Sequence, residues 1–364
     1  MQTLNPPEIV GAKLVEWYSC IVARDVDQAE ESKKTVEELI SNMRKHDKVD
    51  THYKLVQLRH QFMLLELKME ITPEELEKMK IKADASDNRL KYLYYFMTAQ
   101  YEMYKHRFKS AIRTFQIAQK YLDNVNDIYE RGEFYQRLGF CYYRLDDYTS
   151  AIKYTKKSLE ILNLSDKHEE RAMNCKLIQA YIATELNHYD KAELIYEEIL
   201  GISEAYPLSQ SIIYRGLALN RIRQKKFLDA KKFLIRSLDI DASKNTLTEI
   251  QNKYNLANTL YRLGENKEAK KTLDEAEEKS LEYDLIEQIA KSVITRGLYE
   301  SYNQDMIDDG LEILKQNELY FEFSEMSEEV ADFLEDNNQF EEALKYLRLA
   351  RQAPNNLKLL EDLL

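Results

Sequence analysis

The feature that most constrains this chain is a four-residue pattern, an aromatic residue three positions before an alanine, which recurs at nearly constant spacing. Its five copies are Phe108–Ala111, Tyr148–Ala151, Tyr189–Ala192, Phe227–Ala230 and Phe340–Ala343. Asn266–Ala269 keeps the spacing without the aromatic residue. Successive alanines are separated by 40, 41, 38 and 39 residues, and the last step of 74 residues equals two units of 37. Repeats of this length in helical sequence predict a solenoid of helical hairpins.

A second small residue lies twelve positions before each of these alanines. The six residues are Ala99, Gly139, Ala180, Ala218, Ala257 and Ala331. Two small residues at this spacing allow the two helices of a hairpin to pack closely, which is the packing signature of tetratricopeptide repeats. The usual period is 34 residues, so these units have longer helices or loops. With only 8 Gly and 5 Pro in 364 residues, the predicted fold class is all-α.

The N-terminal part of the chain does not follow the repeat but contains three apolar stripes at helical spacing. The stripes are Val10, Leu14, Trp17, Tyr18 and Ile21; Ala29, Val36, Ile40 and Met43; and Leu55, Leu58, Phe62 and Leu65. Asp25 or Asp27 is a candidate cap for the second helix. This pattern predicts a three-helix bundle at 1–68.

A helix start follows the bundle, at Thr72-Pro73-Glu74-Glu75. In this sequence Thr caps the helix, Pro takes the first helical position, and the second Glu reaches back to the amide of the cap. We therefore expect a helical linker at 69–90 and an array of about seven tetratricopeptide hairpins at 91–364.

The net charge of −12 argues against a general nucleic-acid-binding protein, which needs clustered Lys and Arg. The charge is distributed unevenly. Between Arg215 and Arg236 eight basic residues stand against one acid, and from Gly310 onward thirteen acids stand against five bases. Each run is interpreted as a solvated face. Alternatively, one run lines a ligand groove and the other forms a face that binds a partner.

Other functional classes find little support in the sequence. No apolar run approaches the ~20 residues that span a bilayer, the N-terminus lacks the features of a signal peptide, and the three cysteines are far apart, so we expect a cytoplasmic protein. Neither a glycine-rich phosphate loop nor a metal motif is present, and we expect no cofactor. The polar residues His46, Asp47, Asp50, His52 and His60 lack a convergent ligand spacing and are better interpreted as solvated.

The N-terminal residues, followed by the widened repeats, resemble one family, the Rap proteins of Bacillus, which are response regulator aspartate phosphatases and their non-catalytic relatives. The residues that carry the resemblance are Glu16-Trp17-Tyr18, Asp27-Gln28-Ala29-Glu30, Met43, Tyr53-Lys54-Leu55 and Leu58-Arg59-His60-Gln61-Phe62-Met63. The resemblance implies that the bundle and linker bind the receiver or DNA-binding domain of a response regulator. It also implies that the repeats bind a short secreted signalling peptide of the Phr type, in quorum sensing that controls sporulation or competence.

The resemblance also implies a catalytic position. Phosphatase members insert a Gln from the loop between the second and third helices into the phospho-Asp site of the receiver, and the aligned residue in this chain is Asp47. A carboxamide can donate a hydrogen bond to a phosphoryl oxygen, whereas a carboxylate only accepts. We therefore expect regulator binding and leave open whether the chain is an enzyme. The alternatives are an active aspartyl-phosphate phosphatase and a generic tetratricopeptide scaffold.

The repeat register places a set of polar and aromatic residues on the concave side of the array. The expected peptide-binding residues are Tyr143, Arg144, Tyr181, Glu185, Arg215, Gly216, Tyr254, Asn255, Asn258 and Arg262. Glu185 falls where the family tends to place an Asp that contacts the peptide. Gly216 falls where the family places an Asn that holds the peptide backbone, and Asn255 or Asn258 could supply a carboxamide instead.

Overall fold

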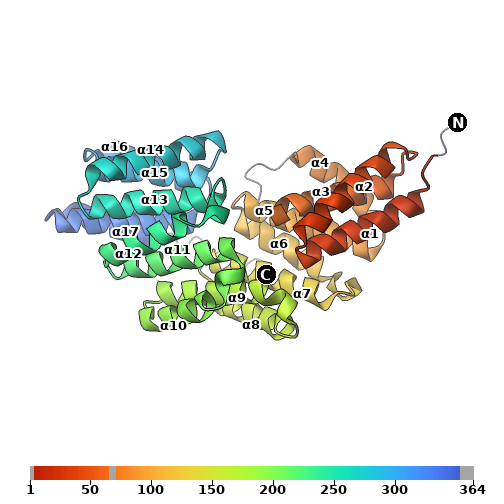
Figure 1. Cartoon of the computed structure of the whole chain (residues 1–364). Coiled ribbons are helices and arrows are strands. Elements are labelled where there is room, and N and C mark those ends of the chain that lie inside the picture. The colour runs from red at the N-terminus through yellow and green to blue at the C-terminus, as the bar shows by residue number, and fades with distance from the viewer. Residues whose placement is uncertain (1–3, 65–70, 353–364) are drawn as a thin grey trace. The chain divides into compact units, whose positions relative to one another are not determined.

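The computed structural model describes residues 4–64 and 71–352, and these residues form eighteen α-helices connected by short turns (Figure 1). Leu65 of the third apolar stripe, the start of the expected linker at 69–70 and the end of the expected array at 353–364 lie outside the described residues. The helical repeats confirm the predicted all-α tetratricopeptide fold. None of the described helices combines the length and the apolar character that crossing a bilayer requires.

The chain divides into two compact units. Unit 1 comprises the chain up to Leu138 together with Lys157–Glu169, and unit 2 comprises Gly139–Lys156 together with the chain from Glu170 onward. The helices that lie wholly or mainly in unit 1 are α1 (Pro7–Ala23), α2 (Val26–Ser41), α3 (Asp47–Leu64), α4 (Pro73–Asp84), α5 (Asn88–Tyr104), α6 (Phe108–Gln119) and α7 (Ile128–Tyr143). The division of the chain into 1–68, 69–90 and 91–364 by function stays a prediction.

Local sequence accounts for where the helices of unit 1 begin. Thr72 Oγ1 accepts a hydrogen bond from the Glu75 amide at 3.2 Å, and Glu75 Oε2 accepts one from the Thr72 amide at 3.1 Å, so the predicted capping box is present. Asp25, and not Asp27, caps α2, because its side chain accepts from the Gln28 amide. Each of these contacts satisfies an amide that the first helical turn leaves without an intrahelical partner.

The first three helices pack around Trp17, which is fully buried. Its indole Nε1 donates a hydrogen bond to Nδ1 of His60 at 3.0 Å, so the polar atom of the ring is satisfied inside the core. Glu30 approaches the other nitrogen of His60 at 3.3 Å. Trp17 is therefore an anchor of the bundle core, and His60 is held by its neighbours in that core.

A buried ion pair connects the bundle to α7. Arg59 of α3 donates to both carboxylate oxygens of Glu133 in α7, at 3.1 and 2.7 Å, and each side chain is only 4% exposed. The Arg59 guanidinium also lies over the ring of Phe96, at 5.0 Å. Beside this pair, the Tyr18 hydroxyl donates to the carboxylate of Glu130, and burial raises the pKa of Glu130. These contacts make α1, α3 and α7 parts of one packed unit.

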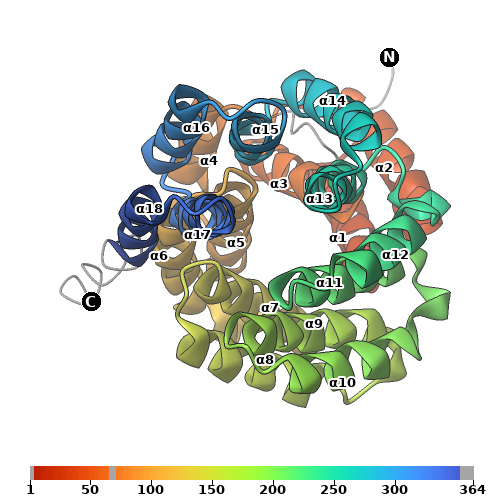
Figure 2. The same ribbon diagram turned by 90° about the vertical axis from the view of Figure 1, so that its left-hand side faces the viewer.

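The second unit repeats one hairpin design. Its helices are α8 (Tyr148–Leu162), α9 (Glu169–Glu185), α10 (Tyr189–Leu200), α11 (Pro207–Arg223), α12 (Phe227–Leu238), α13 (Leu247–Arg262), α14 (Asn266–Glu282), α15 (Ile286–Tyr299), α16 (Gln304–Gln316), α17 (Tyr320–Asp336) and α18 (Phe340–Gln352), of which α8 is shared with unit 1. Within unit 2 the helices α9, α11, α13, α15 and α17 lie on the inner side and their partners on the outer side (Figure 2).

The small residues of the repeat lie where the two helices of each hairpin meet. Ala180, Ala192, Ala218 and Ala230 have no exposed surface. The hairpin whose repeat pattern is not recognisable in the sequence is α15–α16. Its two helices pack closely because residue 310 is a glycine: a Cβ at Gly310 would lie 2.5 Å from Cγ1 of Ile294. The sequence expectation of one degenerate unit between Ala269 and Ala343 is thus explained.

Most hairpin turns contain one residue with left-handed backbone, two positions before the second helix. Examples are Asp146 at φ 58°, Asn187 at φ 59° and Gly264 at φ 76°. Asn, Asp and Gly adopt this conformation more readily than other residues. The turn geometry therefore recurs along the chain together with the small-residue pairs.

The buried pair between Arg59 and Glu133 generates a stability prediction. Glu133→Gln leaves the Arg59 charge buried without its bidentate partner, so we expect a loss of ~3 kcal/mol in the free energy of unfolding. Urea unfolding followed by circular dichroism measures it. Glu16→Gln, which removes the exposed pair with Lys13, is the matched control and should lose less than ~1 kcal/mol. Equal losses in the two variants would contradict the assignment.

Candidate functional site

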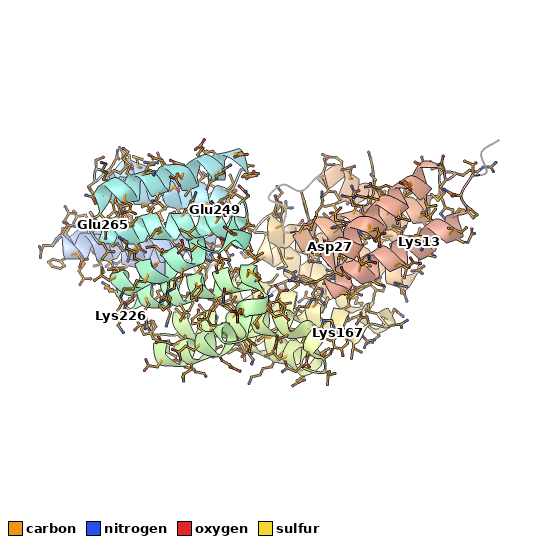
Figure 3. The ribbon with its side chains drawn as sticks, viewed as in Figure 1. Lys13, Asp27, Lys167, Lys226, Glu249 and Glu265 are labelled. Atoms are coloured by element: carbon orange, nitrogen blue, oxygen red, sulfur yellow. The ribbon has the colours of Figure 1, made fainter. Side chains whose placement is uncertain are left out.

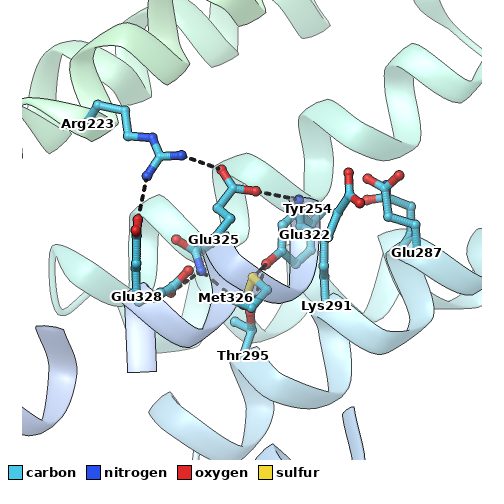
Figure 4. A network of polar contacts seen from close by, with 12 residues as sticks. Arg223, Tyr254, Glu287, Lys291, Thr295, Glu322, Glu325, Met326 and Glu328 are labelled. Carbon is cyan, nitrogen blue, oxygen red and sulfur yellow. Dashed lines mark hydrogen bonds and ion pairs between the residues drawn. The ribbon is translucent and has the colours of Figure 1, made fainter. Parts of the chain in front are cut away.

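The inner face of α17 carries carboxylates that meet basic side chains from distant parts of unit 2 (Figure 4). We call these residues the inner charge cluster. Its cations are Arg144, Arg223, Arg262 and Lys291, and its acids are Glu185, Glu287, Glu322, Glu325, Glu328 and Glu329. Because the cations come from the ends of α7, α11 and α13 and from α15, this cluster joins the expected peptide-binding residues to α17.

Arg144, at the end of α7, forms ion pairs with Glu322 of α17 and, at 3.4 Å, with Glu287 of α15. Burial alone would lower the pKa of Arg144, but Glu322 and Glu287 outweigh it and raise the pKa. The preceding residue, Tyr143, is buried and its ring centroid lies 5.8 Å from that of Phe321 in α17. Both residues therefore face α17 of the same chain.

Arg223, at the end of α11, is shared by three carboxylates. It lies 2.8 Å from Glu185, 3.3 Å from Glu328 and 3.7 Å from Glu325. One guanidinium does not neutralise three acids, and burial raises the pKa of Glu185 to about 7, with Glu325, Asp146 and Glu328 adding to the effect while Arg223 opposes it. Lys291 of α15, 3.6 Å away, supplies a second positive charge to Glu325.

The residues expected on α13 meet the C-terminal part of α17. Glu329 accepts from Asn258 Nδ2 at 2.6 Å and pairs with Arg262 at 3.0 Å. The Tyr254 hydroxyl lies 3.1 Å from Thr295 Oγ1 of α15. Asn255, the other candidate carboxamide, is buried in the same helix. The α13 side chains are therefore part of a polar network within unit 2.

Arg215 and Gly216 differ from the other expected residues. Arg215 in α11 is half-buried, and none of the carboxylates in the described part of the chain lies within ion-pair distance of it. A Cβ at Gly216 would lie 2.5 Å from Cε1 of Tyr196 and 3.2 Å from Cε1 of Tyr181. Gly216 is thus a position of close helix packing against an aromatic ring, and the space that an Asn would need there is filled by Tyr196.

All ten expected peptide-binding residues lie in unit 2, whereas Asp47 lies in unit 1. The sequence reasoning missed Arg223, Lys291 and the acids of α17. The signal was available in the two uneven charge runs: Arg223 pairs with Glu325 and Glu328, and Lys225 pairs with Asp332 at 3.2 Å. The basic run and the acidic run therefore meet each other.

Several other basic residues of the run from Arg215 to Arg236 are paired locally. Arg221 pairs with Glu193, Lys231 with Glu265 at 2.6 Å, and Lys232 with Asp229. Figure 3 shows Lys226 and Glu265 toward the left-hand end of unit 2 in that view. The run is consequently dispersed over several partners and does not gather into one anion-binding patch.

Asp47 is the first residue of α3, just after the connection where the family resemblance places a catalytic residue. Its side chain is 68% exposed and forms an ion pair of 2.6 Å with Lys82 of α4, and the hydrogen bond from Lys82 lowers the pKa of Asp47. At neutral pH the residue is therefore a carboxylate. Among the described residues no three His, Cys, Asp or Glu side chains are grouped as a metal site; His46, for instance, accepts a hydrogen bond from the Val49 amide.

Comparison with known proteins identifies two family models in the chain. The model for the N-terminal part of response regulator aspartate phosphatase H matches residues 4–65, which contain α1 to α3. A tetratricopeptide repeat model matches residues 132–161 and 250–278. Family models therefore match both the bundle and the repeats.

Similarity to Rap proteins extends over nearly the whole chain. The chain is 26% identical over 375 residues to response regulator aspartate phosphatase I of Bacillus subtilis strain 168, a match that covers 97% of this chain and 92% of that protein. It is similar to the crystal structure of a Rap protein complexed with competence and sporulation factor, with a TM-score of 0.85 and 20% identity over 96% of this chain and 99% of that one. The structural likeness supports the fold.

Another relative is named as a methyltransferase and not as a Rap protein. The chain is 35% identical over 358 residues to type II methyltransferase M.CeqI of Rhodococcus hoagii, a match that covers 97% of this chain and 69% of that protein. The described residues of the present chain are helical and form no sheet of the kind that carries a doubly wound nucleotide-binding crevice.

The contact at Gly216 generates the second prediction. Gly216→Ala places a methyl group against the buried ring of Tyr196, so the ring or the helix must shift, and we expect a loss of ~1–3 kcal/mol in the free energy of unfolding. Gly201→Ala is the matched control, because its Cβ would meet no atom closer than 3.5 Å. Thermal and urea unfolding compare the two variants. A Gly216→Ala protein as stable as Gly201→Ala would disprove the close contact.

The raised pKa of Glu185 generates the third prediction. The folded chain binds a proton at Glu185 up to about pH 7, whereas a Glu in an unfolded chain titrates near ~4.3. Stability from this group is therefore present at low pH and lost as the pH rises through about 7. Glu185→Gln mimics the protonated form, so its stability relative to the parent should rise by ~1–3 kcal/mol between pH 5 and pH 7.5. Urea titrations at several pH values test this, with the exposed Glu204→Gln as control; parallel profiles for parent and Glu185→Gln would refute it.

Proposed function

Because this chain belongs to the Rap family of response regulator aspartate phosphatases and their relatives, we propose that it binds a response regulator and that a short signalling peptide modulates this binding. The observation that carries the proposal is the match of α1 to α3 to the N-terminal family model, since generic tetratricopeptide arrays do not contain this bundle. We propose that it acts in the cytoplasm, in keeping with the wide spacing of its three cysteines in the sequence.

The regulator-binding surface belongs to the bundle in this proposal. Asp47 lies at the exposed start of α3, so a partner can reach it. The ion pair with Lys82 ties this position to α4, the helix that follows the bundle. A receiver domain that contacts Asp47 would therefore also meet α4, which agrees with a regulator surface made of bundle and linker.

The chemistry of Asp47 favours binding without rapid phosphate release. An ionised carboxylate next to a phosphoryl group of charge about −1.5 to −2 is repelled by it, by a few kcal/mol at ~4 Å and an effective dielectric constant of ~20. It also lacks a donor for the phosphoryl oxygen. Lys82 offsets part of this repulsion, but it does not supply the carboxamide geometry that orients an attacking water.

The inner side of unit 2 supports the peptide part of the proposal. It brings together aromatic rings, carboxamides and charged groups from α9, α11 and α13, a combination that can hold both the backbone and the side chains of an extended peptide. Arg144, Arg223 and Arg262 already pair with carboxylates of α15 and α17. A peptide therefore binds beside these pairs or competes with α17 for the arginines.

The fourth prediction tests the regulator-binding function and the role of Asp47 together. We expect the protein to retain a phosphorylated receiver domain while leaving the lifetime of its phospho-Asp nearly unchanged, and we expect Asp47→Gln to accelerate phosphate release. Size-exclusion chromatography scores retention, and release of labelled phosphate scores hydrolysis. Asp27→Gln, an exposed change on α2, is the matched control.

Three outcomes would count against this proposal. Rapid release by the unchanged protein would make it an active phosphatase. Loss of release in Asp47→Ala would show that the carboxylate participates in the chemistry. Failure to retain any receiver or output domain of a response regulator would favour the alternative of a generic scaffold.

A further inference from the structure

Three of the expected peptide-binding residues of unit 2 are arginines, Arg144, Arg215 and Arg262, and a guanidinium is well suited to bind a carboxylate. Two of them have carboxylate partners within the chain: Arg144 pairs with Glu322 and Glu287, and Arg262 pairs with Glu329. For Arg215, by contrast, the described residues supply no ion pair. The three positions are therefore not equivalent, and Arg215 is the one whose charge is available to a ligand.

The surroundings of Arg215 restrict what it can bind. Its Nε is buried and has no hydrogen-bond acceptor among the described residues, and the same holds for the hydroxyl of Tyr181 in α9. The Tyr181 ring lies 3.2 Å from the Cβ position of Gly216, the residue after Arg215, and Arg215 opposes the rise in the pKa of Tyr181 that burial causes. A guanidinium only donates hydrogen bonds, and the phenol can donate one more. The complementary ligand is an anionic oxygen acceptor.

Aromatic rings frame this pair of donors. The Tyr181 ring stacks on Tyr143 at 5.8 Å between centroids and meets Tyr196 edge-on at 6.2 Å. Tyr196 in turn packs against the Cβ position of Gly216, next to Arg215. The rings fix the orientation of the Tyr181 side chain, so the donors are held in place before a ligand arrives. Buried donors without an acceptor have lost their hydrogen bonds to water without replacement, and a bound acceptor would restore them.

We infer that Arg215 and the hydroxyl of Tyr181 form a carboxylate-binding subsite for the peptide. This inference rests on the proposed function and specifies its ligand chemistry: the peptide presents either its terminal carboxylate or an Asp or Glu side chain between α9 and α11. Arg144 and Arg262 keep their partners in α15 and α17 and do not contact the carboxylate of the peptide.

The experiment uses the full-length protein and defined peptide pools. One pool contains randomised pentapeptides with a free C-terminus, a second is amidated, and a third has a free C-terminus but no Asp or Glu. Bound peptides are separated from free peptides by size exclusion and identified by mass spectrometry. Recovered sequences are then synthesised with each carboxylate neutralised in turn, by amidation, Asp→Asn or Glu→Gln, and titrated calorimetrically.

We expect neutralisation of one carboxylate to weaken binding to the unchanged protein by about tenfold or more. Arg215→Gln should weaken the parent peptide by a similar factor and remove the difference between the charged and the neutralised peptide. Tyr181→Phe keeps the ring and removes only the hydroxyl, so it should weaken binding by a smaller factor. Arg236→Gln, at an exposed position of α12, should change nothing, and circular dichroism melts verify that each variant folds.

The outcomes separate this inference from the proposed function. Peptides that bind equally well with every carboxylate neutralised, or that are insensitive to Arg215→Gln and Tyr181→Phe, would overturn the subsite and leave peptide binding intact. Recovery of no peptide from any pool would overturn the peptide part of the proposed function and the subsite with it. A carboxylate preference that is abolished by Arg262→Gln and unaffected by Arg215→Gln would place the subsite on α13 and refute the assignment to Arg215.

Discussion

The inner side of unit 2 depends on the pairing of charges that have been removed from water. Isolated ionised groups in a protein interior lose several kcal/mol of hydration, and only close partners of opposite sign compensate for the loss. The carboxylates of α17 and the cations at the ends of α7, α11 and α13 provide these partners for one another. Burial raises the pKa of Glu185 to about 7, and acids of the inner charge cluster, which outnumber its cations, add to this rise.

The cluster exists because the hairpins are built alike. Pairs of small residues, such as Ala218 with Ala230, let the helices of a hairpin approach closely, and a left-handed residue two positions before the second helix sets most of the turns. Similar hairpins give a similar rotation from one unit to the next, which accumulates along a solenoid. In this chain the accumulated rotation carries α17 back to residues more than a hundred positions earlier, such as Arg223.

The sequence predicts the local features of the hairpins, but it does not predict that α17 returns to residues of much earlier helices. The small-residue pairs predicted the hairpins, and Thr72 to Glu75 predicted a helix start, because both patterns depend on residues close in the chain. The partners of Arg144 and Arg262 were not predicted, since the rotation that brings α17 to them is the sum of several hairpins, and a small error in each changes which residues meet. Gly216 was interpreted as a missing side chain, whereas Tyr196, twenty positions earlier, fills the space. The two charge runs indicated these partners, because a basic run and an acidic run of similar net charge in one chain can form ion pairs with each other.

The position of α17 near the C-terminal end of the described chain has a consequence for synthesis on the ribosome. Arg144 and Glu322 are 178 residues apart in sequence, and at ~5–20 residues per second about 9 to 36 s separate their translation. During that interval the hairpins before α17 can fold, because each depends only on its neighbours, but Arg144, Arg223 and Arg262 do not yet have their partners in α17. The inner charge cluster therefore acquires its full set of ion pairs only after α17 has been translated, and a chain that stops before α17 lacks the pairs of Arg144 with Glu322 and of Arg262 with Glu329.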